Sequence, residues 1–181
     1  HMSVDISCLI CPRTEHVAGV EFPFTTERLH VGIEADDLTR PQVHALLTEH
    51  LADMHATSPA ESVHALDLTG LRGPDVSVWT AWDADELLGI VALKELSPDH
   101  GELKSMRTST AARGRGVASS MLVHVLDVGR QRGYLRVSLE TGSQDYFAPA
   151  RRLYVRHGFV EGLPFGDYVL DPSSTFYSLS L

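Results

Sequence analysis

The stretch that most constrains the fold of this chain runs from Glu102 to Ala118. Its first part, Glu102–Thr108, alternates apolar and polar residues as a strand does, and Arg113-Gly114-Arg115-Gly116-Val117-Ala118 then leads into a helix. The first N–H groups of a helix have no partner inside the helix, and the helix dipole adds partial positive charge there. A strand that ends in a glycine-rich turn and opens a helix therefore predicts a site for an anion such as a phosphate.

Length and composition predict a single domain. The chain has 181 residues, of which 43% are hydrophobic, and its formal net charge of −9 argues against nucleic acid as a partner. It contains no apolar run long enough for a membrane span. Residues 1–25 lack periodicity and are predicted to be an N-terminal extension, with His1-Met2 as a cloning remnant, so that residues 26–181 form the domain.

The cysteines and histidines do not predict a metal site. Cys8 and Cys11 form a single CxxC without the second ligand pair of a zinc site and without the strand–helix context of a redox motif. His44, His50 and His55 are spaced six and five residues apart, and no HExxH occurs. Few cysteines and the absence of a signal pattern predict a reducing, cytoplasmic location.

The order of predicted elements indicates a mixed sheet. A strand and two helices come first, followed by an antiparallel meander, and the strand–helix–strand unit around the glycine-rich turn predicts a parallel pair with a right-handed crossover. We therefore expect an α/β (α+β) fold with a mostly antiparallel sheet, helices on both faces and a central parallel strand pair. The predicted strands are 27–33, 76–82, 86–96, 102–108, 135–140, one beginning at 159–160, and 176–181, and the predicted helices are 41–56, a short one toward Leu71, 117–132 and 149–157.

Three kinds of phosphate site compete for the glycine-rich turn. A P-loop needs Gly-x4-Gly-Lys-Ser/Thr, which is absent. A dinucleotide fingerprint needs a third Gly or Ala where Ser119 stands, although Glu140 roughly fits the acid that ends the next strand. The third alternative is Arg-x-x-Gly-x-Ala, from Arg113 to Ala118.

This third pattern resembles the acetyl-coenzyme A pyrophosphate loop of the GNAT N-acetyltransferase superfamily. The resemblance covers roughly Val76 to Phe159 and includes Ala150-x-x-Leu153-Tyr154-x-x-x-Gly158-Phe159. It implies an acyltransferase that uses acetyl-CoA and no metal. The usual asparagine three residues before Ala150 is replaced by Phe147, so the resemblance does not predict which residues line the cleft at that point.

The resemblance also implies how acetyl-CoA is held. The loop and the first turn of its helix would bind the diphosphate, with the two glycines letting the backbone approach and the two arginines adding charge. The main chain of the preceding strand would pair with the pantetheine arm, and the strand at 137–140 would splay away to leave room for the thioester. The implied cofactor-binding residues are Met106, Arg107, Thr108, Arg113, Gly114, Arg115, Gly116, Val117, Ala118 and Ser119.

The chemistry is the direct attack of an amine on the thioester, which needs a base, an oxyanion donor and an acid. Tyr154 stands at the family position of the acid for the leaving thiolate. Glu102 is the first candidate base, although Lys104 two residues on could pair with it, and strict alternation would put Met106 and Thr108 on the same face. Glu140 is the second candidate, and a water path is the third.

The acceptor is predicted only as a class. We expect a primary amine on a small molecule or an amino-acid-like compound, contacted by the two-helix region and the last hairpin. A protein N-terminus or lysine is an alternative acceptor, and a non-catalytic CoA-binding or sensing module is an alternative function. Neither nucleic acid nor membrane is expected as a partner, and homodimer formation stays open. Candidate acceptor contacts are His55, Ser62, His64, Asp167, Tyr168 and Asp171.

Overall fold

We analysed a computed structural model of the chain, which describes residues 31–57, 59 and 66–181. The predictions made for residues 1–25, including the Cys8–Cys11 pair, lie outside the described residues. So do Ser62 and His64 and most of the predicted start of the second helix.

The described residues form one mixed sheet of seven strands in the order β1-β2-β3-β4-β5-β7-β6. All neighbouring strands pair antiparallel except β4 and β5, which are parallel. This confirms the predicted sheet type and its central parallel pair. The strands are β1 (Gly32–Ala35), β2 (Val76–Asp83), β3 (Glu86–Ser97), β4 (His100–Thr108), β5 (Arg136–Gly142), β6 (Val160–Gly162) and β7 (Ser174–Ser180).

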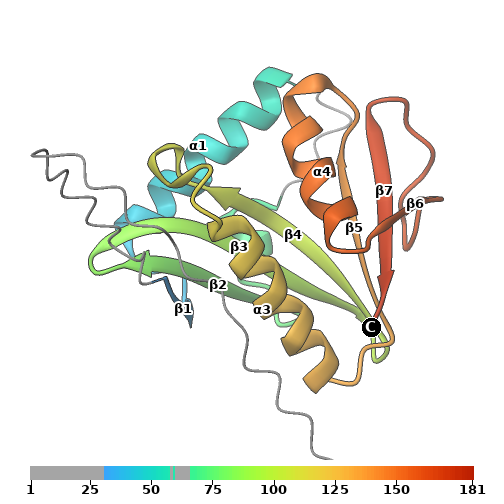
Figure 1. Cartoon of the computed structure of the whole chain (residues 1–181), viewed down its shortest axis with the longest axis horizontal. Helices are drawn as coiled ribbons and strands as arrows, with labels where there is room; N and C mark the ends of the chain where they lie inside the picture. The colour runs from blue at the N-terminus through green and yellow to red at the C-terminus, as the bar shows by residue number, and fades with distance from the viewer. Residues whose placement is uncertain (1–30, 58, 60–65) are drawn as a thin grey trace, which may run out of the picture.

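Helices cover both faces of the sheet, as predicted. Helix α1 (Pro41–Thr57) and the short α2 (Leu68–Leu71) pack on one face, where Val43, Leu46 and Leu47 join Ile90 and Ala92 of β3 in one apolar cluster. Helices α3 (Val117–Gln131) and α4 (Ala148–Arg156) share the other face (Figure 1), where the larger core cluster lies. Burial of the apolar stripe of each helix stabilises this three-layer arrangement.

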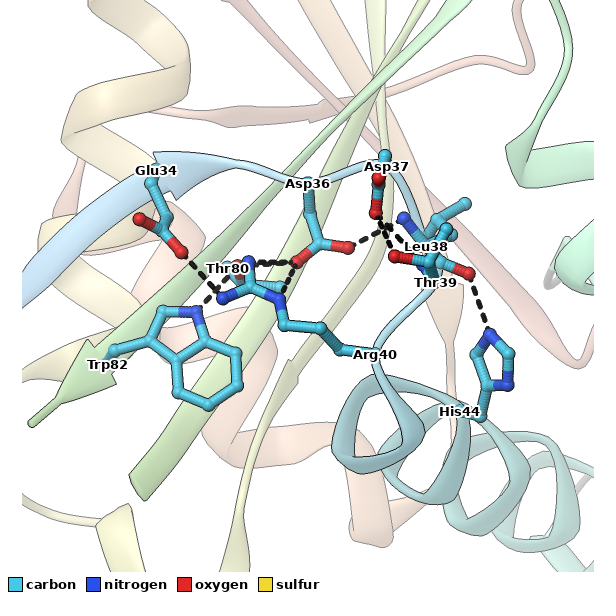
Figure 2. Close-up of polar contacts among 9 residues, drawn as sticks. All are labelled: Glu34, Asp36, Asp37, Leu38, Thr39, Arg40, His44, Thr80 and Trp82. Atoms are coloured by element: carbon cyan, nitrogen blue, oxygen red, sulfur yellow. Dashed lines mark hydrogen bonds and ion pairs between the residues drawn. The ribbon is translucent and has the colours of Figure 1, made fainter. Parts of the chain in front are cut away.

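The junction between β1 and α1 is held by Arg40 and its partners (Figure 2), which we call the junction cluster: Glu34, Asp36, Arg40, Thr80 and Trp82. The Arg40 guanidinium donates to Glu34 Oε1 at 2.7 Å. Its Nε and Nη2 both donate to Asp36 Oδ2, and it lies 4.3 Å from the centroid of the Trp82 ring. Asp36 also accepts from the Thr80 hydroxyl and from the Leu38 amide. Arg40, Thr80 and Leu38 each donate a hydrogen bond to the buried carboxylate of Asp36.

Thr39-Arg40-Pro41-Gln42 has the sequence pattern of a capping box, but the Thr39 side chain does not cap helix α1. The Thr39 hydroxyl donates to Asp37 Oδ1 at 2.6 Å, and α1 starts at Pro41, with the amides of Val43 and His44 bonded to the Arg40 carbonyl. The hydroxyl is therefore used in a local turn with Asp37, a competition that short polar side chains often win.

The parallel pair β4–β5 is short. Only His100–Glu102 pair with Arg136–Ser138, although β4 continues to Thr108 and β5 to Gly142. The two strands diverge beyond this pairing, and Figure 1 shows the gap widening toward the C-terminal ends of both strands. The carboxyl ends of parallel strands are where ligands bind in α/β sheets, so this divergence positions the site.

Candidate active site

A cleft of about 650 Å³ lies where β4 and β5 separate. Its walls come from β4, from the loop that enters α3, from the end of β5, from α4 and from the middle of α1. Most of the predicted site residues meet here. Of the predicted cofactor and catalytic residues, Met106, Arg107, Thr108, Arg113, Gly114, Gly116, Val117, Ala118, Ser119 and Tyr154 line the cleft, whereas Glu102 and Arg115 do not.

A β-bulge in β4 changes which side chains face which helix. Ile90 of β3 pairs with Arg107 and Ala92 pairs with Lys104, so the single residue between them on β3 opposes two residues, Ser105 and Met106. Ser105 has φ +48°, in the left-handed region. The extra residue of a bulge interrupts the alternation of the strand and leaves part of the backbone ladder unpaired.

The bulge makes the prediction of strict alternation wrong beyond Lys104. Met106 packs into the core on the α3 side, whereas Arg107 pairs with carboxylates of α1. Lys104 opposes Ala92 and Arg107 opposes Ile90, and both of these β3 residues belong to the α1-side cluster. Two basic side chains therefore stand on the same face of β4, close to its divergence from β5.

The glycine-rich loop has the backbone that the anion-site hypothesis requires. Gly114 and Gly116 have φ +75° and +83°, and a Cβ at either position would meet no protein atom within 4 Å. Glycine is needed here for its conformation, because left-handed backbone costs other residues about 1–2 kcal/mol. Gly116 is the N-cap of α3 and no side chain caps the helix, so the first amides of α3 stay available to a ligand.

Three arginines line the cleft near this loop: Arg113, Arg152 and Arg156. The second predicted loop arginine, Arg115, instead forms an ion pair with Asp83 at 3.5 Å. A chain of net charge −9 thus places several cations in the lining of one cleft, which favours a polyanionic group such as a diphosphate.

Tyr154 lies in the wall formed by α4 and is buried. Its hydroxyl donates to Met106 Sδ at 3.7 Å, which links α4 to the bulge in β4. Burial raises the pKa of this hydroxyl well above its usual value, and the nearby charge of Glu140 raises it further. The phenol therefore keeps its proton at neutral pH and can act as an acid.

Glu102 is buried in β4 beside two donors and outside the cleft lining. Its Oε1 accepts from Lys104 Nζ at 3.1 Å and from the Tyr168 hydroxyl at 2.6 Å. Tyr168 also receives a hydrogen bond from Lys104 Nζ at 2.7 Å, and burial followed by the Glu102 charge raises the Tyr168 pKa strongly. Of the two glutamates considered as bases, Glu140 alone lines the cleft.

Arg107 holds the α1 wall of the cleft against β4. Its Nη2 donates to Glu49 Oε1 and to Asp53 Oδ2, both at 2.6 Å, and its Nη1 donates to the Tyr146 hydroxyl at 3.2 Å. Tyr146 donates to Asp53 Oδ2 at 2.8 Å. We call these four residues (Glu49, Asp53, Arg107 and Tyr146) the cleft cluster. It ties α1, β4 and the turn Asp145–Phe147 together at the mouth of the cleft.

His50 lies in the same wall and is nearly buried. Burial, followed by the positive charge of Arg107, lowers the pKa of its imidazole to about 4, and the charge of Asp53 opposes this shift. The imidazole is therefore neutral at physiological pH. Three residues of the cleft carry a buried polar atom without a hydrogen-bond partner: His50 Nδ1, Ser105 Oγ and Arg107 Nε.

The family assignment follows from comparison with known proteins. The Acetyltransferase (GNAT) family matches residues 42–159, which contain β2 to α4 and the whole cleft. The chain belongs to this family. It is therefore an acyltransferase, and it is an acetyl-CoA-dependent N-acetyltransferase by class.

The curated relatives cover the same region. YsnE of Bacillus subtilis (strain 168), an uncharacterized N-acetyltransferase, is 52% identical over 149 residues, which are 82% of this chain and 99% of YsnE. YedL of Escherichia coli (strain K12), also an uncharacterized N-acetyltransferase, is 51% identical over 149 residues, 82% of this chain and 94% of YedL.

Solved structures share the fold. A protein from Klebsiella pneumoniae whose name places it among acyl-CoA N-acyltransferases superposes with a TM-score of 0.72 at 25% identity, over 84% of this chain and 99% of that chain. A Bacillus subtilis acetyltransferase in complex with CoA superposes with a TM-score of 0.59 at 17% identity, over 83% and 99% of the two chains.

The described part of the chain contains neither a cluster of metal ligands nor a membrane-spanning helix. Among residues 31–57, 59 and 66–181, no group of three or more His, Cys, Asp or Glu residues is placed to hold a metal ion. Within the same residues, no helix has the length and apolar character needed to cross a membrane.

The sequence did not reveal the cleft cluster or the role of Lys104 in the cleft. Glu49 and Asp53 do have the i, i+4 spacing that puts two carboxylates on one helix face, which is a usable signal. Their partner Arg107 could not be found in the same way, because the bulge that turns it toward α1 has no glycine or proline to mark it. Among the candidate acceptor contacts in the described residues, Tyr168 binds Glu102 and Lys104.

Proposed function

We propose that the chain transfers an acetyl group from acetyl-CoA to a primary amine of a small molecule, in a ternary complex. The observation that carries this proposal is the cleft itself. It joins an uncapped helix N-terminus with left-handed glycines at one end to a buried, protonated tyrosine in its wall. One end suits a diphosphate, and the other suits an acyl thioester.

The cofactor would lie along the gap between β4 and β5. The amides at the start of α3, together with Arg113, would hold the diphosphate. On the edge of β4 that faces β5, where the ladder ends at Glu102, the backbone of Met106, Arg107 and Thr108 would bind the amides of the pantetheine arm as an added strand does. Arg152 and Arg156 of α4 would face the remaining phosphate of CoA. These assignments are supported by the lining of the cleft.

The reaction forms one bond and breaks one. The amine lone pair attacks the carbonyl carbon, a C–N bond forms, the C–S bond breaks, and the thiolate leaves with the proton of Tyr154. The amine proton passes to a carboxylate or to water. An amide freed by the bulge at Ser105 would stabilise the oxyanion that develops on the carbonyl oxygen.

Glu140 and Glu102 have different roles in this proposal. Glu140 lines the cleft and lies close enough to Tyr154 to affect its pKa, which supports Glu140 as the group that accepts the amine proton. Glu102 is engaged by Lys104 and Tyr168, which supports a positioning role. The variants Glu140→Gln and Glu102→Gln separate the two. If Glu140 is the base, Glu140→Gln should remove the increase of kcat with rising pH. If Glu102 is a positioning residue, Glu102→Gln should change KM alone.

The test is single-turnover thiol release from acetyl-CoA with a panel of primary amines. Tyr154→Phe should lower the chemical rate about 100-fold, the range of general acid catalysis, and leave CoA affinity unchanged. Tyr134→Phe is the matched control, because this buried tyrosine bonds Glu95 and stands outside the cleft. An unchanged rate in Tyr154→Phe would remove Tyr154 from the mechanism.

A sensing module is the second candidate function. It predicts tight CoA binding and no turnover with any amine. The buried Tyr154 beside Met106 favours the enzyme, because binding alone does not need a phenol held in its protonated form at the thioester end of the cleft.

A further inference from the structure

The cleft wall formed by β4 carries polar atoms that no residue of the described part of the chain satisfies. Ser105 Oγ and Arg107 Nε have no hydrogen-bond partner, and the two residues are 8% and 7% exposed. A buried polar group without a partner costs about 1–3 kcal/mol, so native structures seldom retain one without a purpose. The bulge lies between Lys104 and Arg107, and both Ser105 and Arg107 line the cleft.

The bulge also brings a second cation to this wall. Lys104 and Arg107 stand on the α1 face of β4 opposite Ala92 and Ile90, on either side of Ser105. Lys104 Nζ has three N–H donors, of which Glu102 and Tyr168 take two. Both basic residues and the serine line the cleft. The wall therefore offers a run of donors on a serine and on two cations that are also ion-paired with carboxylates.

The carboxylates that pair with Lys104 and Arg107 do not occupy all of the N–H donors of these two residues. Glu49 and Asp53 accept from Arg107 Nη2, and the Tyr146 hydroxyl accepts from Nη1, which leaves the Nε–H side of the guanidinium. Glu49 and Asp53 are themselves 52% and 36% exposed, so water solvates them, whereas the Arg107 side chain is 8% exposed. Glu102 lies under Lys104 and outside the cleft lining.

We propose that Lys104, Ser105 and Arg107 form a subsite for an anionic oxygen group of the acceptor, and that the acceptor is an amine that also carries a carboxylate. The ligand that satisfies guanidinium, hydroxyl and ammonium donors together is an oxyanion, and a carboxylate has the two oxygens that they need. A serine hydroxyl turns toward a ligand by rotation about a single bond. This inference rests on the proposed acetyltransferase function and adds the substrate class.

The subsite lies on the correct side for the reaction. Tyr154 reaches the bulge from the α3–α4 face through Met106, whereas Lys104 and Arg107 stand on the α1 face. An acceptor held by its carboxylate on the α1 face brings its amine to the thioester from the side opposite the leaving-group acid. Glu140 lines the same cleft.

The experiment compares matched acceptors with the full-length chain. The twenty standard L-amino acids are assayed by thiol release beside their carboxamides, which keep the amine and lose the anion. The best amino acid should have a kcat/KM at least ten-fold above its carboxamide, the range of a charge-assisted hydrogen bond. Equal or better use of the carboxamides overturns the inference, and their turnover still supports the proposed acetyltransferase.

Two serine variants assign the preference to the subsite. Ser105→Ala and Ser105→Gly both remove Oγ, and the glycine also relieves the positive φ. Both should raise KM for the amino acid several-fold more than KM for its carboxamide, so that the ratio of the two is the readout. Ser109→Ala is the control, because its Oγ is also buried without a partner but lies outside the cleft lining. Equal losses for both acceptors in the Ser105 variants overturn the subsite.

Binding keeps the inference testable if no amine is turned over, an outcome that would count against the proposed function. The same amino acids and carboxamides are then titrated by calorimetry into the protein saturated with CoA. Carboxylate-selective binding that Ser105→Ala weakens supports the subsite, and binding that does not distinguish the two forms overturns it.

Discussion

Arg40 and Arg107 each join two carboxylates beside an aromatic ring, but only the hydrogen-bond network of Arg40 is complete. In the junction cluster, Arg40 joins Glu34 and Asp36 beside Trp82, and no buried side-chain atom of these residues lacks a hydrogen-bond partner. In the cleft cluster, Arg107 joins Glu49 and Asp53 beside Tyr146, and its own Nε is buried without a partner. A network in which every buried polar atom is hydrogen-bonded stabilises the local structure. A network at a cleft that leaves one such atom without a partner can be completed by a ligand.

The strongest way to test this contrast is to remove Arg40. The Asp36 side chain is fully buried, so Arg40→Ala leaves a buried carboxylate without its cation, and unfolding free energy should fall by about 3–5 kcal/mol. Urea denaturation measures this loss. The kcat/KM of the protein that remains folded should not change, because Arg40 lies outside the cleft lining.

The double variant Asp36→Ala/Arg40→Ala is the control for this prediction, because it removes the stranded charge together with its partner. It should recover part of the lost stability. If Arg40→Ala were as stable as the double variant, the junction cluster would not hold β1 to α1 through its charges.

The second test uses pH and the cleft wall. Native His50 takes a proton only below about pH 4, whereas an unfolded histidine does so near pH 6.5. The unfolded state thus binds more protons between these values, so stability should fall as pH drops from about 6.5 to 4, by up to about 3 kcal/mol. His50→Gln should flatten this slope in denaturation curves measured across the range. A slope that persists would assign it to other groups.

The third test removes Arg107. Glu49 and Asp53 are partly exposed and can be hydrated when their partner is lost, so Arg107→Ala should cost less stability than Arg40→Ala. The kcat/KM for the amine should fall roughly 30-fold, equivalent to about 2 kcal/mol. Arg107→Lys keeps the charge but loses the fork, and it should restore only part of the activity. A stability loss larger than that of Arg40→Ala would reverse the comparison.

The smallest effects are expected at two glycines with nearly the same backbone. Gly116 has φ +83° at the start of α3, Gly133 has φ +82° just beyond its end, and a Cβ at either would meet no protein atom within 4 Å. Alanine should cost each about 1–2 kcal/mol of stability. Only Gly116→Ala should also raise KM for acetyl-CoA, measured by steady-state kinetics, because only Gly116 lines the cleft. Equal KM values would place the cofactor elsewhere.

The sequence was sufficient for the parts of the fold that local patterns encode. The alternation in β2 and β3, the amphipathic α3 and the glycine-rich turn each carry their own signal, and the structure confirms their arrangement in a mixed sheet. The Lys104–Glu102 pair also followed from spacing along one strand. The bulge at Ser105 did not, because nothing local marks it, and every side-chain direction after it was inverted as a result.

Contacts between distant segments were the other limit. Tyr146 and Asp53 are 93 residues apart, and Tyr168 and Glu102 are 66 apart. These hydrogen bonds join the turn after β5 to α1, and the segment before β7 to β4. Such contacts follow from the topology, which no spacing in the sequence expresses. Charge pattern alone could suggest that Glu49 and Asp53 share a cation, without indicating which one.

The short pairing between β4 and β5 has a consequence for motion. Three residue pairs join these strands, and the backbone of β4 beyond Glu102 has no β5 ladder to protect its amides from exchange with solvent. A pantetheine arm that completes this ladder would act as a missing strand. Hydrogen exchange of the amides from Leu103 to Thr108 should therefore slow when acetyl-CoA binds, and the melting temperature should rise with ligand concentration. The part of β4 that lines the cleft is thus also the part of the sheet whose rigidity depends on bound acetyl-CoA.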